Sequence, residues 1–223
     1  MNGWWVSEIL NDPNRGPAVL VAWCVLVIGA IVLHELAHGW AALRLGDPTP
    51  RDLGHMTWNP LVHMGGMSLV VFALVGIAWG AMPFDPSRLR GRYGDALVAL
   101  AGPAMNIALA IVSFVCLLLW LALGGTVSEP LRGNLETFFT LGVRLNIVLA
   151  VFNLLPVLPL DGGRVAASLS PAYDRFAHGE NGRWIMLGGF ILFFWFGIGV
   201  VVLIADILLE GGLAIAKAVF GIG

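Results

Sequence analysis

Two histidines and a glutamate stand together in His34-Glu35-Leu36-Ala37-His38, inside a long apolar stretch. Helical side chains four residues apart share a face, so His34 and His38 can bind one metal ion. Glu35 can then take a proton from a zinc-bound water. The pattern predicts zinc-assisted hydrolysis, and its position within residues 18–45 puts that chemistry in or near a membrane.

Composition places the chain among integral membrane proteins. It is 58% hydrophobic and 12% charged, with a mean hydropathy of +0.86, whereas soluble domains carry about 25% charged residues. The 223 residues fit a single integral membrane domain spanning residues 1–223. Because there is no basic run, nucleic acid is not expected as a partner. Cys24 and Cys116 both lie in apolar segments, which indicates neither a disulfide framework nor a cysteine metal cluster.

The apolar segments predict an all-α polytopic membrane protein. The stretches long enough to span are residues 18–45, 96–123, 138–160 and 185–204. Residues 67–81 are shorter and interrupted by glycine, and we expect them to be re-entrant. Residues 207–220 contain Gly211-Gly212, Glu210 and Lys217, which favours an interfacial or re-entrant helix. The expected architecture is a bundle of about four spanning helices with these two additions.

A catalytic zinc usually takes three protein ligands, so His34 and His38 need a third. Asp161 is the best candidate, because charged residues at membrane depth are costly and tend to be functional. It follows Pro156 and Pro159, which break regular helix pairing, and precedes Gly162-Gly163. Asp before Gly-Gly is also a turn signal, so a purely structural role for Asp161 is the alternative.

Three motifs together resemble the site-2 protease family of intramembrane zinc metallopeptidases. They are the histidine pair with Glu35, the segment from Ala101 to Asn106 (AGPAMN), and Asn153 with the distal Leu160-Asp161-Gly162-Gly163. The match is to the compact branch, which has no PDZ or CBS domain. It implies that His34, His38 and Asp161 bind one zinc per chain, that Glu35 is general base and acid, and that Asn153 steadies the substrate carbonyl or oxyanion.

The resemblance also implies partners. The substrate would be a transmembrane segment of another membrane protein, met within the lipid bilayer. A regulatory membrane partner would take the place of the missing PDZ or CBS domain. Gly102 and Asn106 are assigned to helix packing, and His55 and His63 to polar loops. Arg164 is expected to pair with Asp161 or with a lipid phosphate.

Topology follows from the metal ligands. If Asp161 ends the third span and meets His34 and His38, both spans run the same way, so one crossing lies between them. Residues 96–123 supply it, and residues 67–81 must return. Most arginines then share the metal side: Arg44, Arg51, Arg88, Arg90, Arg92, Arg164, Arg175 and Arg183. The positive-inside rule puts the metal near the cytoplasmic face of a bacterial-type cell membrane.

Two other functions use the same residues. One is a metal-binding or transport protein that passes zinc across the membrane, which should show more ligands along a pathway. The other is an inactive scaffold that binds membrane proteins without cutting them. Glu35 separates these hypotheses, because only a peptidase should lose its activity on Glu35→Gln while keeping its zinc.

Overall fold

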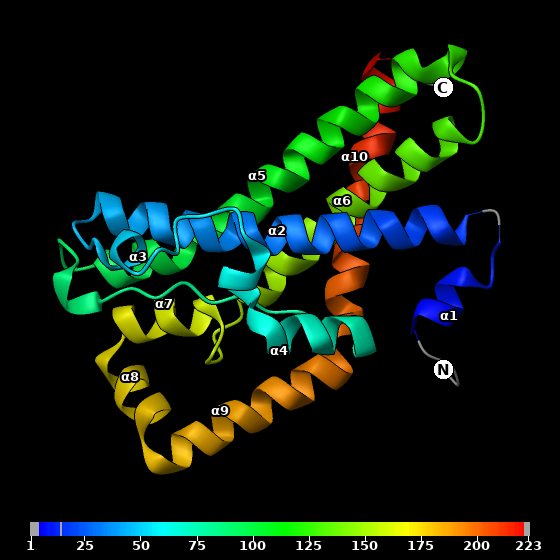
Figure 1. Ribbon diagram of the computed structural model, residues 1–223. Helices are drawn as coiled ribbons and strands as arrows, with labels where there is room; N and C mark the ends of the chain where they lie inside the picture. Colours follow the sequence, from blue (N-terminus) through cyan, green and yellow to red (C-terminus); the bar gives the residue numbers. More distant parts are fainter. Residues whose placement is uncertain (1–4, 14, 221–223) are drawn as a thin grey trace.

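The computed structural model describes residues 5–13 and 15–220, whose regular structure is helical without strands (Figure 1). Three short helical turns are η1 (Pro86–Arg88), η2 (Gly124–Thr126) and the π-helical η3 (Phe193–Gly197). The helices are α1 (Trp5–Leu10), α2 (Gly16–Arg44), α3 (Thr49–Asp52), α4 (Pro60–Val75), α5 (Gly94–Leu123), α6 (Leu131–Asn153), α7 (Asp161–Leu169), α8 (Pro171–His178), α9 (Glu180–Leu192) and α10 (Ile198–Phe220).

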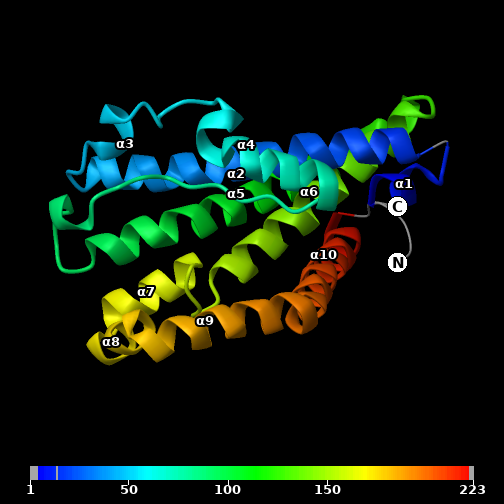
Figure 2. The ribbon, with the colours of Figure 1, turned by 60° about the horizontal axis from the view of Figure 1, so that its bottom comes forward.

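Four helical runs are long and apolar enough to cross a membrane, which confirms an all-α polytopic membrane protein. They are Gly16–Arg44, Gly94–Thr126, Leu131–Asn153 and Glu180–Val219. α5 packs against both α2 and α6, and α10 packs mainly against α6. In both ribbon views α3, α7 and α8 lie at one end of the bundle, and α1 and the α5–α6 turn lie at the other (Figures 1 and 2).

α4 and the segment after it form the expected re-entrant piece. The helix bends at Gly65, whose φ is 68°, and stops at Gly76, whose φ of 80° suits glycine. The chain then turns back along α2 in an extended form (Figure 2). Ser68 Oγ accepts from the Trp79 amide at 2.9 Å, and the Ala81 amide donates to the His63 carbonyl at 2.9 Å. Ala81 therefore lies beside the beginning of α4, so the segment leaves on the side where it entered.

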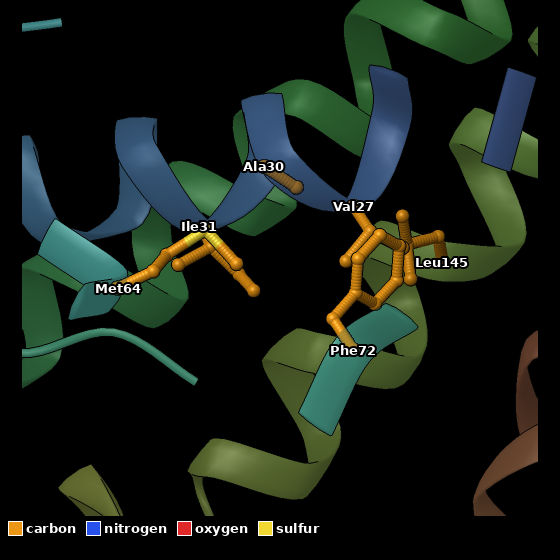
Figure 3. Packing of buried hydrophobic residues seen from close by; sticks show 6 residues of the cluster. All are labelled: Val27, Ala30, Ile31, Met64, Phe72 and Leu145. Atoms are coloured by element: carbon orange, nitrogen blue, oxygen red, sulfur yellow. The ribbon is translucent and has the colours of Figure 1, made fainter. Parts of the chain in front are cut away.

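Apolar contacts hold the re-entrant helix in place. Phe72 of α4 lies beside Val27 of α2 and Leu145 of α6, and Met64 lies against Ile31 (Figure 3). All of these side chains are less than 10% exposed. Their burial fixes α4 against the half of α2 that precedes the histidine pair.

The third span ends earlier than predicted. α6 covers Leu131–Asn153, residues 154–160 are irregular, and Asp161 begins α7 instead of ending the span. Pro156 and Pro159 have no amide hydrogen to continue the helix, which explains the break. Gly162 and Gly163 fit closely here, since a Cβ on Gly163 would lie 2.6 Å from the Leu158 nitrogen.

The predicted division of the C-terminal region is wrong. Residues 185–204 and 207–220 do not form separate pieces, because α10 is one helix across the proposed gap. The direction changes instead at the π-turn η3, where α9 and α10 meet at a bend (Figure 1). Gly212 lies within this helix and allows close packing, since a Cβ there would lie 2.9 Å from Phe114 Cζ.

Asp47 fastens the loop that follows α2. Its carboxylate is fully buried and accepts from the Thr49 amide at 3.0 Å, the Thr49 hydroxyl at 2.5 Å and the Asp85 amide at 2.7 Å. Burial by itself would raise the pKa of Asp47. The hydrogen bonds and the positive charge of Arg88 lower that pKa below its ordinary value. The loop carrying Asp85 is thereby tied to the C-terminal end of α2.

Asp47→Ala is expected to lower the stability of the folded protein by about 1–3 kcal/mol, because two partly buried amides and a hydroxyl lose their acceptor. The contribution of Asp47 to the free energy of unfolding is complete above about pH 4, the pKa of an aspartate in the unfolded chain. It is lost as the pH falls through the lower pKa that Asp47 has in the folded protein. Thermal melts in detergent at several pH values would measure the difference. Asp52→Ala, at a carboxylate whose side chain is 56% exposed, is the control and should melt like wild type.

Candidate metal centre

Three potential metal ligands meet where α2 passes the start of α7. His34 and His38 lie on the buried side of α2, and their Nε2 atoms are 3.0 Å apart. Asp161 Oδ2 lies 3.1 Å from His34 Nε2 and 3.4 Å from His38 Nε2. The structure therefore brings together the three residues that the sequence proposed as metal ligands.

Partners on α5 hold both imidazole rings by the opposite nitrogen. His34 Nδ1 donates to Asn106 Oδ1 at 2.6 Å, and His38 Nδ1 donates to the Val98 carbonyl at 2.7 Å. Asn106 in turn donates to Asn146 Oδ1 of α6 at 3.0 Å. A carbonyl only accepts, so the proton sits on Nδ1 and the Nε2 lone pair is free for a metal.

Gly102 allows α5 to come this close. A Cβ at Gly102 would lie 2.5 Å from His34 Nε2, and it would also collide with His38 Nε2. The backbone of α5 thus forms one wall of the site, directly against the two ligand atoms.

The donor set fits a tetrahedral cation of the zinc type. Two imidazole nitrogens and a carboxylate oxygen are common zinc ligands, and bonds of about 2.0–2.1 Å at tetrahedral angles place ligand atoms about 3.3 Å apart. Asp161 Oδ2 is buried and makes no hydrogen bond to any residue that the structure describes. A buried carboxylate oxygen that faces two imidazole Nε2 atoms suits a cation.

Glu35 lies beside this centre beneath the re-entrant segment. Its side chain is buried at 7% exposure. A Cβ on Gly80 would lie 2.6 Å from both Glu35 Cγ and Oε1. The returning chain therefore passes directly over the carboxylate that the sequence assigns to proton transfer.

Arg164 connects α7 to its surroundings, but not in the way the sequence suggested. Its guanidinium binds Asp95 of α5 at 2.9 Å rather than Asp161, and it lies over the Phe84 ring, 4.1 Å from the centroid. Ser168 donates to the other Asp95 oxygen at 3.0 Å. Since Asp161 begins α7, this network helps to position it against α2.

The remaining candidates are separate from the ligand cluster. Asn153 is the last residue of α6 and donates to the Leu149 carbonyl at 3.0 Å. Among the described residues it makes no hydrogen bond to the three ligands, and its oxyanion role stays a prediction. His63 is buried, with its Nε2 on the Thr57 carbonyl at 2.7 Å, and its ring lies 6.2 Å from that of His55.

Helix packing is only part of what Asn106 and Gly102 do, although it is the role that the sequence favours for them. The structure places Asn106 on a ligand imidazole and Gly102 against both. The signal for Asn106 was present in its spacing, because Gly102 and Asn106 share a helical face one turn apart. The missing fact was that this face of α5 meets the histidine pair.

Comparison with known proteins agrees with the ligand geometry. The sequence matches Peptidase family M50 over residues 22–129 and 121–196. The chain belongs to this family. The resemblance to site-2 proteases is thereby confirmed.

Individual relatives cover most of this M50 chain. "Putative zinc metalloprotease YwhC" of Bacillus subtilis is 35% identical over 159 residues, which are 70% of this chain and 72% of that protein. "Putative zinc metalloprotease MJ0611" of Methanocaldococcus jannaschii is 29% identical over 161 residues, which are 72% of this chain and 76% of that protein. No solved structure matched the chain.

Proposed function

We propose that the protein is a zinc endopeptidase that cuts peptide bonds within or beside transmembrane segments of other membrane proteins. The observation that carries this is the donor set of His34, His38 and Asp161 beside the buried Glu35, inside a bundle of apolar helices. The M50 relatives named zinc metalloproteases support zinc as the metal. The single cluster of three ligands among the described residues supports one zinc per chain.

In the proposed reaction, zinc and the side chains of the protein have separate roles. Zinc, when bound, supplies Lewis acidity that makes a water a stronger acid. Glu35 takes the proton of the attacking water and delivers it to the leaving amine. Asn106 and the Val98 carbonyl keep the imidazoles of His34 and His38 in the tautomer that a metal needs. The amide of Asn153 is assigned to the substrate carbonyl, where it adds a donor without adding charge.

The re-entrant segment forms one wall of the candidate metal site. Gly80 lies directly against Glu35, and Ser68 and His63 hold the neighbouring Trp79 and Ala81 to α4. Backbone groups of a helical substrate are already paired, so a substrate has to unwind before its carbonyl can approach the metal. We therefore expect helix-weakening residues, such as glycine or proline, near the cleaved bond.

The metal end of the bundle is assigned to the cytoplasm. α3, α7 and α8 lie at that end (Figure 1), and Arg51 and Arg175 belong to α3 and α8. Arg44 ends α2, and the η1 turn contains Arg88. This bias supports a cytoplasmic metal site under the positive-inside rule.

The direct test uses purified protein in lipid vesicles with a synthetic transmembrane substrate that carries a Gly-Pro step. We expect cleavage that stops when a chelator removes the metal and returns with added zinc. Zinc flux into the same vesicles should stay at the rate of protein-free vesicles. Zinc flux without peptide cleavage would support the hypothesis of a zinc transporter. Zinc binding with neither flux nor cleavage would support the hypothesis of an inactive scaffold.

The contacts of Asp95 with Arg164 and Ser168 are expected to affect the zinc affinity of the metal site. Asp95→Asn weakens the hold on Arg164 and is expected to lower zinc affinity, but by less than the roughly 10–100-fold that losing a direct partner of a metal ligand costs, because Asp95 contacts Arg164 and not Asp161. Competition with a chromogenic chelator measures the affinity. Asp174→Asn, at an exposed carboxylate of α8 that pairs with His178 instead, is the control and should bind zinc like wild type. If wild type, Asp95→Asn and Asp174→Asn bind zinc with equal affinity, the contacts of Asp95 do not position Asp161.

A further inference from the structure

The two imidazoles of the candidate metal centre are held in different ways. His38 Nδ1 donates to the Val98 carbonyl at 2.7 Å, and a backbone carbonyl can only accept. His34 Nδ1 donates to Asn106 Oδ1 at 2.6 Å, and a side-chain amide can turn over to present its NH2 group instead. The form of His34 that binds metal therefore depends on which way the Asn106 amide faces.

Asn146 of α6 fixes that orientation. Its NH2 group donates to the Gly142 carbonyl, one turn earlier in α6, at 2.9 Å. Since that carbonyl only accepts, Asn146 Oδ1 is the atom that faces Asn106, and it accepts from the Asn106 NH2 group at 3.0 Å. Asn106 Oδ1 is then the atom that faces His34. Three hydrogen bonds thus run in one direction, from His34 to the Gly142 carbonyl.

The opposite orientation of Asn106 would disable the metal site. The side-chain oxygens of Asn106 and Asn146 would face each other, although these residues are only 0% and 3% exposed. That arrangement is costly, because neither buried oxygen would find a donor there. The Asn106 NH2 group would meanwhile face His34 Nδ1 and require a lone pair on it. The imidazole proton would then lie on Nε2, the atom that has to bind the metal.

This unwanted tautomer of His34 has an acceptor nearby. Asp161 Oδ2 lies 3.1 Å from His34 Nε2, so a proton on Nε2 of the metal-free protein would face a carboxylate oxygen. Excluding this tautomer requires a firm acceptor at Nδ1, on the other side of the ring. Asn106 provides that acceptor only while its amide is held in one orientation.

Close packing of α5 and α6 brings the two amides together. Asn106 and Asn146 are 40 positions apart in the chain. A Cβ on Gly142 would lie 2.8 Å from Ser113 Oγ of α5, so the two helices approach closely beside Asn146. We propose that Asn146 is a positioning residue of the metal site, which acts through Asn106 to keep the proton of His34 on Nδ1. This inference rests on the zinc centre proposed above.

The first test measures the tautomer of His34 in metal-free protein labelled with nitrogen-15 histidine, by NMR in detergent. We expect the Nδ1–H form in wild type. In Asn146→Leu, which offers no acceptor, its share should fall to about half or less, because neither orientation of Asn106 is then favoured. Zinc affinity should fall by the same factor, about twofold or more, since only this tautomer binds metal. Asn146→Asp still presents an oxygen to Asn106 and should keep both properties at wild-type values.

A double-mutant cycle tests whether Asn146 acts through Asn106. Asn106→Leu should lower zinc affinity about 10–100-fold, the cost of losing a direct partner of a metal ligand. Adding Asn146→Leu to this variant should lower the affinity no further. Val143→Ala, at a buried residue of α6 outside this hydrogen-bond chain, is the structural control. It should lower the melting temperature but leave the His34 tautomer and the zinc affinity unchanged.

Three results would overturn the proposal. The first is a wild-type share of the Nδ1–H form in Asn146→Leu. The second is an Asn146→Asp variant that loses this form as Asn146→Leu does. The third is an equal loss of zinc affinity on Asn146→Leu whether residue 106 is asparagine or leucine, since that would indicate a purely structural role. None of these measurements uses peptide cleavage, and the tautomer is measured without metal, so the proposed peptidase function and this inference can fail separately.

Discussion

Glu35→Gln is expected to slow peptide cleavage by about 10²–10⁴-fold, the usual contribution of a general acid–base, while zinc stays bound. Glutamine has nearly the same shape and fits under Gly80, but it cannot accept the proton of the water. None of the three ligand atoms belongs to Glu35, so the metal content should stay at that of wild type.

Cleavage of the reconstituted transmembrane substrate and metal analysis of the same sample measure the two effects together. Glu180→Gln, an exposed position at the start of α9, is the matched control and should cut at the wild-type rate. Wild-type cleavage by Glu35→Gln would remove Glu35 from the mechanism. Loss of zinc from Glu35→Gln would show instead that Glu35 supports the metal.

Gly102→Ala is expected to empty the metal site, although glycine to alanine normally strengthens a helix. The added methyl group would stand 2.5 Å from His34 Nε2. The imidazoles cannot simply turn aside, because Asn106 and the Val98 carbonyl hold them from the other edge. We expect zinc affinity to fall by more than the roughly 100-fold that losing an outer contact costs.

The control for this substitution is Gly29→Ala, in α2, where a Cβ meets nothing within 4 Å. That variant should bind zinc normally and melt no lower than wild type. Chelator competition and thermal melts of both variants separate metal loss from misfolding. Wild-type zinc affinity in Gly102→Ala would mean that α5 does not form the wall of the site.

Several features could be predicted from sequence because they depend on local spacing or on composition. The helical repeat puts His34 and His38 on one face. Apolar length predicts the spanning helices, and the shorter, glycine-interrupted stretch of residues 67–81 predicts the re-entrant segment. The need for a third ligand then selected Asp161, and the structure brings it to the pair.

Other features depend on which surfaces meet, and a single sequence does not encode that locally. Gly212 lies inside α10, where the absence of a side chain leaves room for Phe114 of α5. Arg164 could have paired with Asp161, but the position of α5 beside α7 gives it Asp95.

The sequence by itself determined the metal chemistry and the membrane setting of this protein, because both follow from residue types at short spacing. Only the tertiary structure decided how that chemistry is held. Asn106 reaches His34 across 72 positions of the chain, and Arg144 reaches Asp206 across 62. Such pairings arise when helices distant in sequence pack together, so their physical origin is long-range packing rather than local pattern.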